Sequence, residues 1–271
     1  MGRPGHALTG RRPQPGGGRR RPQPEVNAAD RSATPGPRPQ PPAWVLLAHG
    51  SEDPRHAREI EWLAAGMAGR RPDRAVAVAY LDHQPPDLAT AIGALPTRSV
   101  VVVPALLSEA FHALVDVPAA VDAAVAGGAT VALAAAFGAD PAVLAALDEL
   151  AGERQDGDGL LAVAAGTSDA AARTELAGLV DAWGRRRQQA TAVAFAAGAG
   201  PTVADGIAAL RGRGAATVTA VPLVLAPGRL LDRALAQAAA LGAPARPGGL
   251  ARTGALADLA VRRAEQAEKP G

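Results

Sequence analysis

Short apolar runs alternate with amphipathic segments along residues 43–151, which is the pattern of an α/β protein. The clearest run lies within residues 99–106, where four consecutive valines predict a strand buried on both faces of a parallel sheet. The same reasoning predicts strands at residues 44–48, 75–81, 99–106 and 129–135, and helices at residues 54–67, 87–94, 118–126 and 140–150. This order implies a parallel sheet covered by helices.

The second half of the chain repeats the first. Three short segments recur in the same order at offsets of 115 to 118 residues: 48–53 with 164–169, 78–80 with 193–195, and 103–107 with 221–225. Ordered recurrence at a nearly constant offset indicates a duplicated unit. We therefore predict an α/β fold of two fused Rossmann-like subdomains at residues 43–151 and 160–264, with a linker at residues 152–159 and a tail at residues 265–271.

Residues 1–42 have a different composition from the rest of the chain. They contain ten Pro, seven Gly and eight Arg with few apolar residues, a composition that cannot bury enough surface to fold. The segment is Arg-rich and acid-poor like an organelle transit peptide, but its prolines disfavour the amphipathic helix of such peptides. It also lacks the apolar core of a secretory signal. We therefore predict a disordered extension.

Polar residues follow three strands of the first half at the carboxyl edge of the predicted sheet. His49, Asp82 and His112 stand there, and this edge is where open α/β sheets bind ligands. The second half has Ala165, Ala197 and Leu230 at the corresponding positions. Because a like subdomain does without these polar groups, the fold does not require them. Two imidazoles and a carboxylate suit a divalent transition metal or acid–base chemistry.

The remaining histidines are weaker candidates. His83 competes with Asp82 for the place of a third ligand, although a solvated loop histidine explains it as well. We expect His56 on the surface of the first helix, and His6 lies in the extension, so neither is a candidate.

The residues between His49 and the first helix have backbone roles. Gly50 is expected to let the backbone turn close to whatever His49 faces, and Ser51 could hydrogen-bond a bound ligand. An N-cap role also explains Ser51 fully, and Asp116 is a further expected N-cap. We predict Gly50 and Ser51 as ligand-binding residues.

Composition narrows the function further. The chain has no cysteine, which excludes disulfides, thiolate metal sites and cysteine nucleophiles. There is no apolar run of membrane-spanning length, so we expect a cytoplasmic protein without a membrane partner. The formal charge of +2 comes from the extension, and the remaining residues are net negative without a basic stripe. Nucleic acid is therefore not an expected partner.

Nucleotide-dependent chemistry has no support in the motifs. The chain lacks G-x-x-x-x-G-K-[ST] and therefore has no P-loop. Gly198 and Gly200 are followed by Pro201 rather than by a third glycine and a helix, which argues against a dinucleotide site. The G-x-S-x-G motif of many hydrolases is also absent.

Two segments together resemble a known family. The sequences LLAHGSEDP and VVVVPALLSEAFHALVDVP are similar to motifs of the CbiX/SirB family of sirohydrochlorin chelatases, and the resemblance extends over residues 44–262. Long members of that family are two fused chelatase-like halves. The resemblance implies a lyase of the class II chelatases, a sirohydrochlorin cobaltochelatase or ferrochelatase that needs no nucleotide. Its substrates would be Co²⁺ or Fe²⁺ and a sirohydrochlorin-type tetrapyrrole, on a cobalamin or sirohaem route.

The resemblance also implies roles for individual residues. His49 and His112 fall on the family's two metal-handling histidines. Asp82 stands where the family often has a longer Glu, so Asp82 and His83 both remain candidates for the third ligand. The cleft between the halves would hold the tetrapyrrole, with arginines meeting its carboxylates. Either a monomer or a homodimer is compatible with this arrangement.

Two other interpretations remain open at this point. The same histidine pair would also serve a non-catalytic metal or tetrapyrrole carrier. An unrelated doubly wound protein that binds a small acid is the third possibility, and it leaves the histidine difference between the two halves unexplained.

Overall fold

The computed structural model describes residues 40–107, 115–138 and 140–269. The predicted disordered extension therefore falls, up to residue 39, outside the described residues, and so does His112. None of the described helices has both the length and the apolar composition that crossing a membrane requires.

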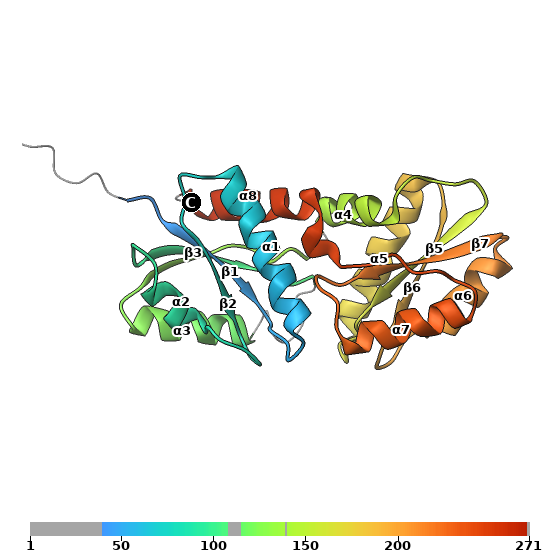
Figure 1. Cartoon of the computed structure of the whole chain (residues 1–271), viewed down its shortest axis with the longest axis horizontal. Helices are drawn as coiled ribbons and strands as arrows, with labels where there is room; N and C mark the ends of the chain where they lie inside the picture. Colours follow the sequence, from blue (N-terminus) through green and yellow to red (C-terminus); the bar gives the residue numbers. More distant parts are fainter. Residues whose placement is uncertain (1–39, 108–114, 139, 270–271) are drawn as a thin grey trace, which may run out of the picture. The chain divides into compact units, whose positions relative to one another are not determined.

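The first half is built on a parallel four-stranded sheet with the order β2-β1-β3-β4 (Figure 1). Its strands are β1 (Ala43–Ala48), β2 (Val76–Tyr80), β3 (Ser99–Pro104) and β4 (Thr130–Leu133). Helices α1 (Pro54–Arg70), α2 (Leu88–Gly93) and α3 (Val117–Ala126) connect them. Every residue of the inner strand β1 is buried, as its unbroken apolar run predicts. The predicted fold class is confirmed.

The second half repeats this topology with one strand fewer. Its sheet has the order β6-β5-β7, formed by β5 (Asp158–Ala164), β6 (Ala190–Phe195) and β7 (Thr217–Leu223). The helices are α5 (Ala170–Arg187), α6 (Val203–Gly212) and α7 (Arg229–Ala240), followed by the short 3₁₀ helix η3 (Leu250–Arg252). At the position of a fourth strand, Ala245 makes only an isolated parallel bridge with Ala220. The strand β5 begins inside the segment predicted as a linker, because Asp158 already pairs with Thr217.

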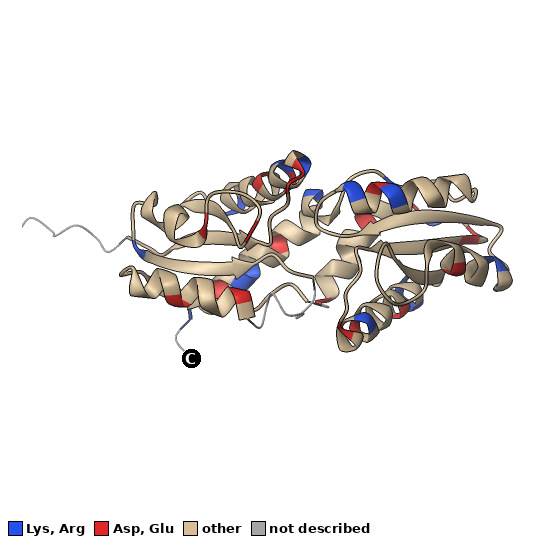
Figure 2. Ribbon diagram, turned by 90° about the horizontal axis from the view of Figure 1, so that it is seen from below, with Lys and Arg blue, Asp and Glu red and all other residues tan. Residues whose placement is uncertain are grey.

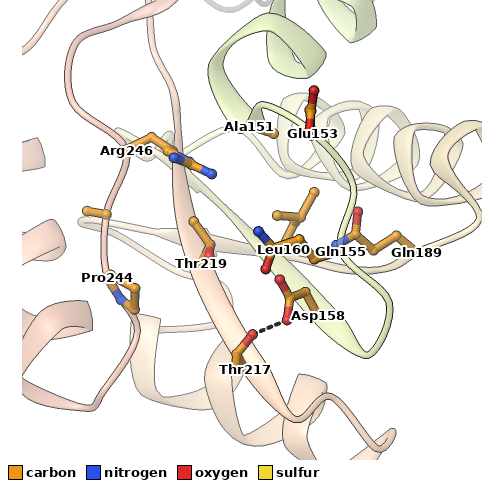
Figure 3. Close-up of a pocket in the computed structure, with 11 residues that line it drawn as sticks. Ala151, Glu153, Gln155, Asp158, Leu160, Gln189, Thr217, Thr219, Pro244 and Arg246 are labelled. Carbon is orange, nitrogen blue, oxygen red and sulfur yellow. Dashed lines mark hydrogen bonds between the residues drawn. The ribbon is translucent and has the colours of Figure 1, made fainter.

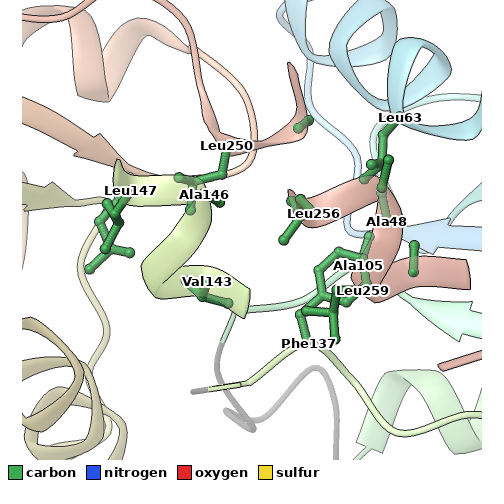
Figure 4. Close-up of a cluster of buried hydrophobic side chains, with 14 of the residues drawn as sticks. Ala48, Leu63, Ala105, Phe137, Val143, Ala146, Leu147, Leu250, Leu256 and Leu259 are labelled. Atoms are coloured by element: carbon green, nitrogen blue, oxygen red, sulfur yellow. The ribbon is translucent and has the colours of Figure 1, made fainter. Parts of the chain in front are cut away.

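The last helix of each half packs against the sheet of the other half. Helix α8 (Gly254–Ala267) lies against α1 and β3, whereas α4 (Pro141–Ala151) lies against α5 and β7. Figure 4 shows where they meet, with Leu256 and Leu259 of α8 near Phe137 and all three side chains fully buried. One hydrophobic cluster therefore runs through both halves, and each half needs the other's last helix to complete its core. The other face of each sheet has a separate cluster under α2 and α3 or under α6 and α7.

Charged residues of both signs are mixed over the helices of the described part (Figure 2). Several ion pairs join the end of α1 and the turn after it to α8 and its C-cap. Arg70 pairs with Asp258, Arg71 with Glu265, and the Arg74 guanidinium donates a 2.9 Å hydrogen bond to Glu268. These pairs hold the exchanged helix α8 in place on the first half.

The pair between Glu59 and Arg252 contains the most buried carboxylate of these contacts and leads to a prediction for stability. The side chain of Glu59 is only 9% exposed, and the Arg252 Nε donates to its two carboxylate oxygens at 2.9 and 2.8 Å. The substitution Arg252→Ala should lower the free energy of unfolding by about 2–3 kcal/mol, because it leaves a desolvated carboxylate unpaired. Urea denaturation measures this change.

The matched control for this prediction is Arg262→Ala. Arg262 is about as exposed as Arg252, but it lies 4.0 Å from Asp140, which keeps a 3.0 Å contact with Arg263. Its loss should therefore cost less than about 0.5 kcal/mol. Equal losses for the two variants would contradict the assignment of Glu59 as a buried partner.

Candidate functional site

The loop after β1 crosses the loop after β2 at a glycine. Gly50 has a φ of +96°, and a Cβ atom added to it would stand 1.9 Å from the carbonyl oxygen of Asp82. The second half has the same crossing, where Gly166 has a φ of +116° and its added Cβ would stand 2.1 Å from the oxygen of Ala197. Gly50 therefore approaches the backbone of Asp82, and no residue with a Cβ atom would fit at this position.

The structure at the start of α1 corrects the expectation that Ser51 is the N-cap. The N-cap is Asp53, whose carboxylate accepts a hydrogen bond from the Arg55 amide at 3.0 Å. Ser51 instead accepts a hydrogen bond from the Asp53 amide at 3.1 Å. In the second half, Thr167 and Asp169 form the same turn. This turn belongs to the fold of both halves, and a ligand-binding role for Gly50 or Ser51 remains a prediction. Asp116 does occupy the N-cap position of α3, but its side chain makes no capping hydrogen bond there.

The carboxyl edge of the first sheet brings two histidines together. The ring centroids of His49 and His83 lie 5.5 Å apart and the rings are perpendicular. Asp82, directly before His83, accepts a 2.7 Å hydrogen bond from the His83 amide, and its second oxygen lies 3.8 Å from the His83 Nε2. His49 and Asp82 thus share one edge, as the strand order predicts, and His83 lies beside them. That they bind a metal ion remains a prediction. Among the described residues, no group of three or more His, Asp or Glu forms a complete metal site.

A cavity of about 470 Å³ lies between the carboxyl edges of the two sheets. His49 and His56 line its first-half side, and a mainly apolar wall faces them from the second half, formed by Ala164, Ala165, Leu176, Leu223, Val224 and Leu225. A second hollow of about 350 Å³ shares Gly50, Ser51 and Gly228 with it and is lined by His83 and Arg229. These volumes are typical of small-molecule sites, which measure about 300–1,000 Å³.

His56 lies in the cavity wall, which corrects its predicted place on the surface. Its Nδ1 atom is buried and has no hydrogen-bond partner among the described residues. Burial lowers the pKa of His56, and the nearby His49 lowers it further, so the imidazole is neutral at pH 7. The sequence does contain a signal for this placement, because His56 precedes the buried Ile60 and Leu63 by four and seven residues.

Arginines lie at the mouth of the cavity. The Arg55 guanidinium donates to Asp53 at 2.6 Å and to Asp232 of α7 at 2.5 Å, which ties the two halves together beside the site. The hydrogen bond from Arg55 lowers the pKa of Asp53 to about 2. Arg229 is exposed at the start of α7 and also contributes to this lowering. The hollow at the mouth of the cavity therefore combines the Arg229 guanidinium with the carboxylates of Glu52 and Asp53 and with His83.

A further pocket lies away from this chemistry. It measures about 310 Å³ and sits at the amino ends of β5 and β7, where Asp158 and Thr217 are hydrogen-bonded (Figure 3). Its lining holds Arg246 and Glu153 but no histidine. The cavity between the carboxyl edges is therefore the candidate functional site.

Comparison with known families agrees with the duplicated fold. The family model CbiX matches the chain twice, over residues 43–154 and again over residues 159–265. The chain belongs to the CbiX family. No curated protein matches it by sequence.

Solved structures share the fold at low sequence identity. SirB from Bacillus subtilis with Fe³⁺ is 18% identical with a TM-score of 0.68, and the match covers 83% of this chain and 94% of SirB. The sirohydrochlorin chelatase SirB from Bacillus subtilis subspecies spizizenii, in complex with cobalt, is 17% identical with a TM-score of 0.64, over 83% and 94% of the two chains.

A larger protein also contains this CbiX-like fold. DR2241 from Deinococcus radiodurans, a multi-domain protein with structural similarity to chelatases, is 22% identical with a TM-score of 0.68. The match covers 84% of this chain but only 56% of DR2241, which has two additional novel domains.

Proposed function

We propose that this CbiX-family chain is a sirohydrochlorin chelatase that inserts Co²⁺ or Fe²⁺ into the tetrapyrrole without nucleotide hydrolysis. The observation that carries the proposal is the cavity between the two sheet edges, with imidazoles on one wall and apolar side chains on the other. A flat macrocycle needs such an apolar surface, and a metal ion needs the imidazoles. The SirB structures with iron and with cobalt support the same class of substrate.

The metal ion would enter as a substrate and be held by His49 and His112, with a third group from the loop after β2. Asp82 is the predicted third group. Neutral imidazole binds divalent cobalt and iron, and a carboxylate balances part of the charge. The ion must then exchange these ligands for the four nitrogens of the macrocycle.

Insertion of a divalent metal releases two protons from the pyrrole nitrogens, so the site must accept them. His56 supports this step, because its imidazole is neutral at pH 7 and forms part of the cavity wall beside His49. We assign it as acceptor of one of these protons. The second half has no counterpart of this histidine, because Ala172 occupies the position that corresponds to His56.

Arg229 would recognise a carboxylate at the rim of the tetrapyrrole, whereas the Arg55 guanidinium is already paired with Asp53 and Asp232. Guanidinium groups bind carboxylates through paired, charge-assisted hydrogen bonds. Arg229 lines the hollow at the mouth of the cavity, so the macrocycle would sit inside with an acidic group directed outward.

An anaerobic insertion assay tests the proposal. The protein is mixed with sirohydrochlorin and Co²⁺ or Fe²⁺, and the absorbance change is followed against the uncatalysed rate. We expect acceleration by the wild type and its loss in His112→Ala. The variant Gln155→Ala, changed in the separate pocket at the amino ends of β5 and β7, should retain most of the rate. Tight metal binding without acceleration would overturn the chelatase and favour the carrier.

A further inference from the structure

His83 adopts a backbone conformation that residues with a Cβ atom generally avoid. Its φ is +66°, in the left-handed region. The corresponding residue of the second half is Gly198, with a φ of +80°. The two loops have the same backbone hydrogen bond, from Asp82 to His49 at 2.9 Å and from Ala197 to Ala165 at 3.1 Å. The loop therefore forms with glycine at this position, and the fold does not explain the histidine.

The distance between the two imidazoles suits a shared metal ion. With a metal–nitrogen distance of about 2.1 Å, two imidazoles on one tetrahedral or trigonal ion have their ring centroids about 5–5.5 Å apart. The centroids of His49 and His83 are 5.5 Å apart. His83 also lines the hollow at the cavity mouth, whereas His49 lines the cavity itself. An ion between them would sit on the route from solvent to the cavity.

The Asp82 carboxylate is placed to orient His83. Its side chain is 67% exposed, one oxygen accepts from the His83 amide, and the other lies 3.8 Å from the His83 Nε2. A carboxylate beside the distal nitrogen of a ligating imidazole commonly fixes the orientation of the ring. Both oxygens of the Asp82 carboxylate therefore face groups of His83, its amide and its Nε2, rather than a separate site.

From these observations we infer that His83 joins His49 as a metal ligand at the cavity mouth and that Asp82 is its positioning residue. This inference rests on the proposed function in assuming that the edge handles a divalent metal. It replaces the Asp82 carboxylate by the His83 imidazole as the group contributed by the loop after β2.

Co²⁺ titration of the full chain without tetrapyrrole, followed by calorimetry and visible absorption, tests the inference. The substitution His83→Gly installs the residue that the second half has. We expect at least about a tenfold loss of Co²⁺ affinity, on the scale of losses seen when metal sites are perturbed. The melting temperature should stay equal or rise, because glycine adopts the left-handed conformation without strain.

Variants of Asp82 separate ligation from positioning. Asp82→Ala, which matches Ala197, should weaken Co²⁺ binding less than His83→Gly and should change the Co²⁺ absorption spectrum. Asp82→Asn retains an oxygen acceptor for the His83 amide and should restore most of the affinity. Wild-type affinity in His83→Gly, or a larger loss in Asp82→Ala than in His83→Gly, would overturn the inference.

The insertion assay distinguishes failure of this inference from failure of the proposed function. If His83→Gly binds Co²⁺ like the wild type while the wild type still accelerates insertion, only the role of His83 is wrong. If His83→Gly loses affinity while the wild type shows no acceleration, the chain is a metal-binding protein and the role of His83 stands.

Discussion

Replacing Gly50 by alanine is expected to lower the free energy of unfolding by about 3 kcal/mol or more and to disrupt metal binding. The left-handed φ of +96° disfavours alanine, and the new methyl group would stand 1.9 Å from the Asp82 carbonyl oxygen. Because that oxygen is backbone, relief requires the whole loop after β2 to move. Asp82 and His83 would move with it.

Gly166→Ala provides the matched control in the second half. Its φ of +116° and its predicted contact of 2.1 Å with the Ala197 oxygen give a similar cost in stability. The loop that moves there has no histidine, so Co²⁺ affinity should be unchanged in the folded protein. Urea unfolding and Co²⁺ titration measure the two effects separately.

Gly69→Ala controls for the substitution itself. Gly69 lies within α1 and has no atom within 4 Å of an added Cβ, so alanine should stabilise the helix by about 0.5–1 kcal/mol. Loss of Co²⁺ binding in both Gly50→Ala and Gly166→Ala would contradict the placement of the metal-handling loop in the first half.

The strand order and the duplication could be predicted from sequence because they depend on local pattern. An unbroken apolar run such as β1 has to be buried on both faces, and parallel strands joined by helices leave few topologies. The exchange of α4 and α8 could not be predicted in the same way. The apolar stripe of a helix shows that it packs, but not against which of two similar sheets. The isolated bridge at Ala245, in place of a fourth strand, likewise depends on tertiary contacts.

The candidate site was predictable where it depends on topology. His49 and Asp82 follow neighbouring strands and do share one edge. His56 departs from the expectation that a polar helix residue faces solvent, because its spacing of four residues from Ile60 places it on the buried stripe. The contact between His49 and His83 depends on a left-handed residue in a loop, and no periodicity encodes that conformation. His112 lies outside the described residues, and its role stays a prediction.

The largest expected effect on function comes from His49→Ala. Its side chain is a metal ligand in both the proposed function and the further inference, so the variant should lose at least about a hundredfold in insertion rate and most of its Co²⁺ affinity. The fold should be retained, because Ala165 stands at the corresponding end of β5. Circular dichroism and thermal denaturation check this second expectation.

The contrasting variant is His56→Ala, which matches Ala172 of the second half. If His56 accepts a proton rather than binding the ion, the variant should keep Co²⁺ affinity while insertion slows by about a hundredfold. Metal binding and proton removal would then be separated between two imidazoles of one cavity wall. Equal loss of Co²⁺ affinity in the two variants would instead make His56 a ligand, and unfolding of His49→Ala would make His49 a structural residue.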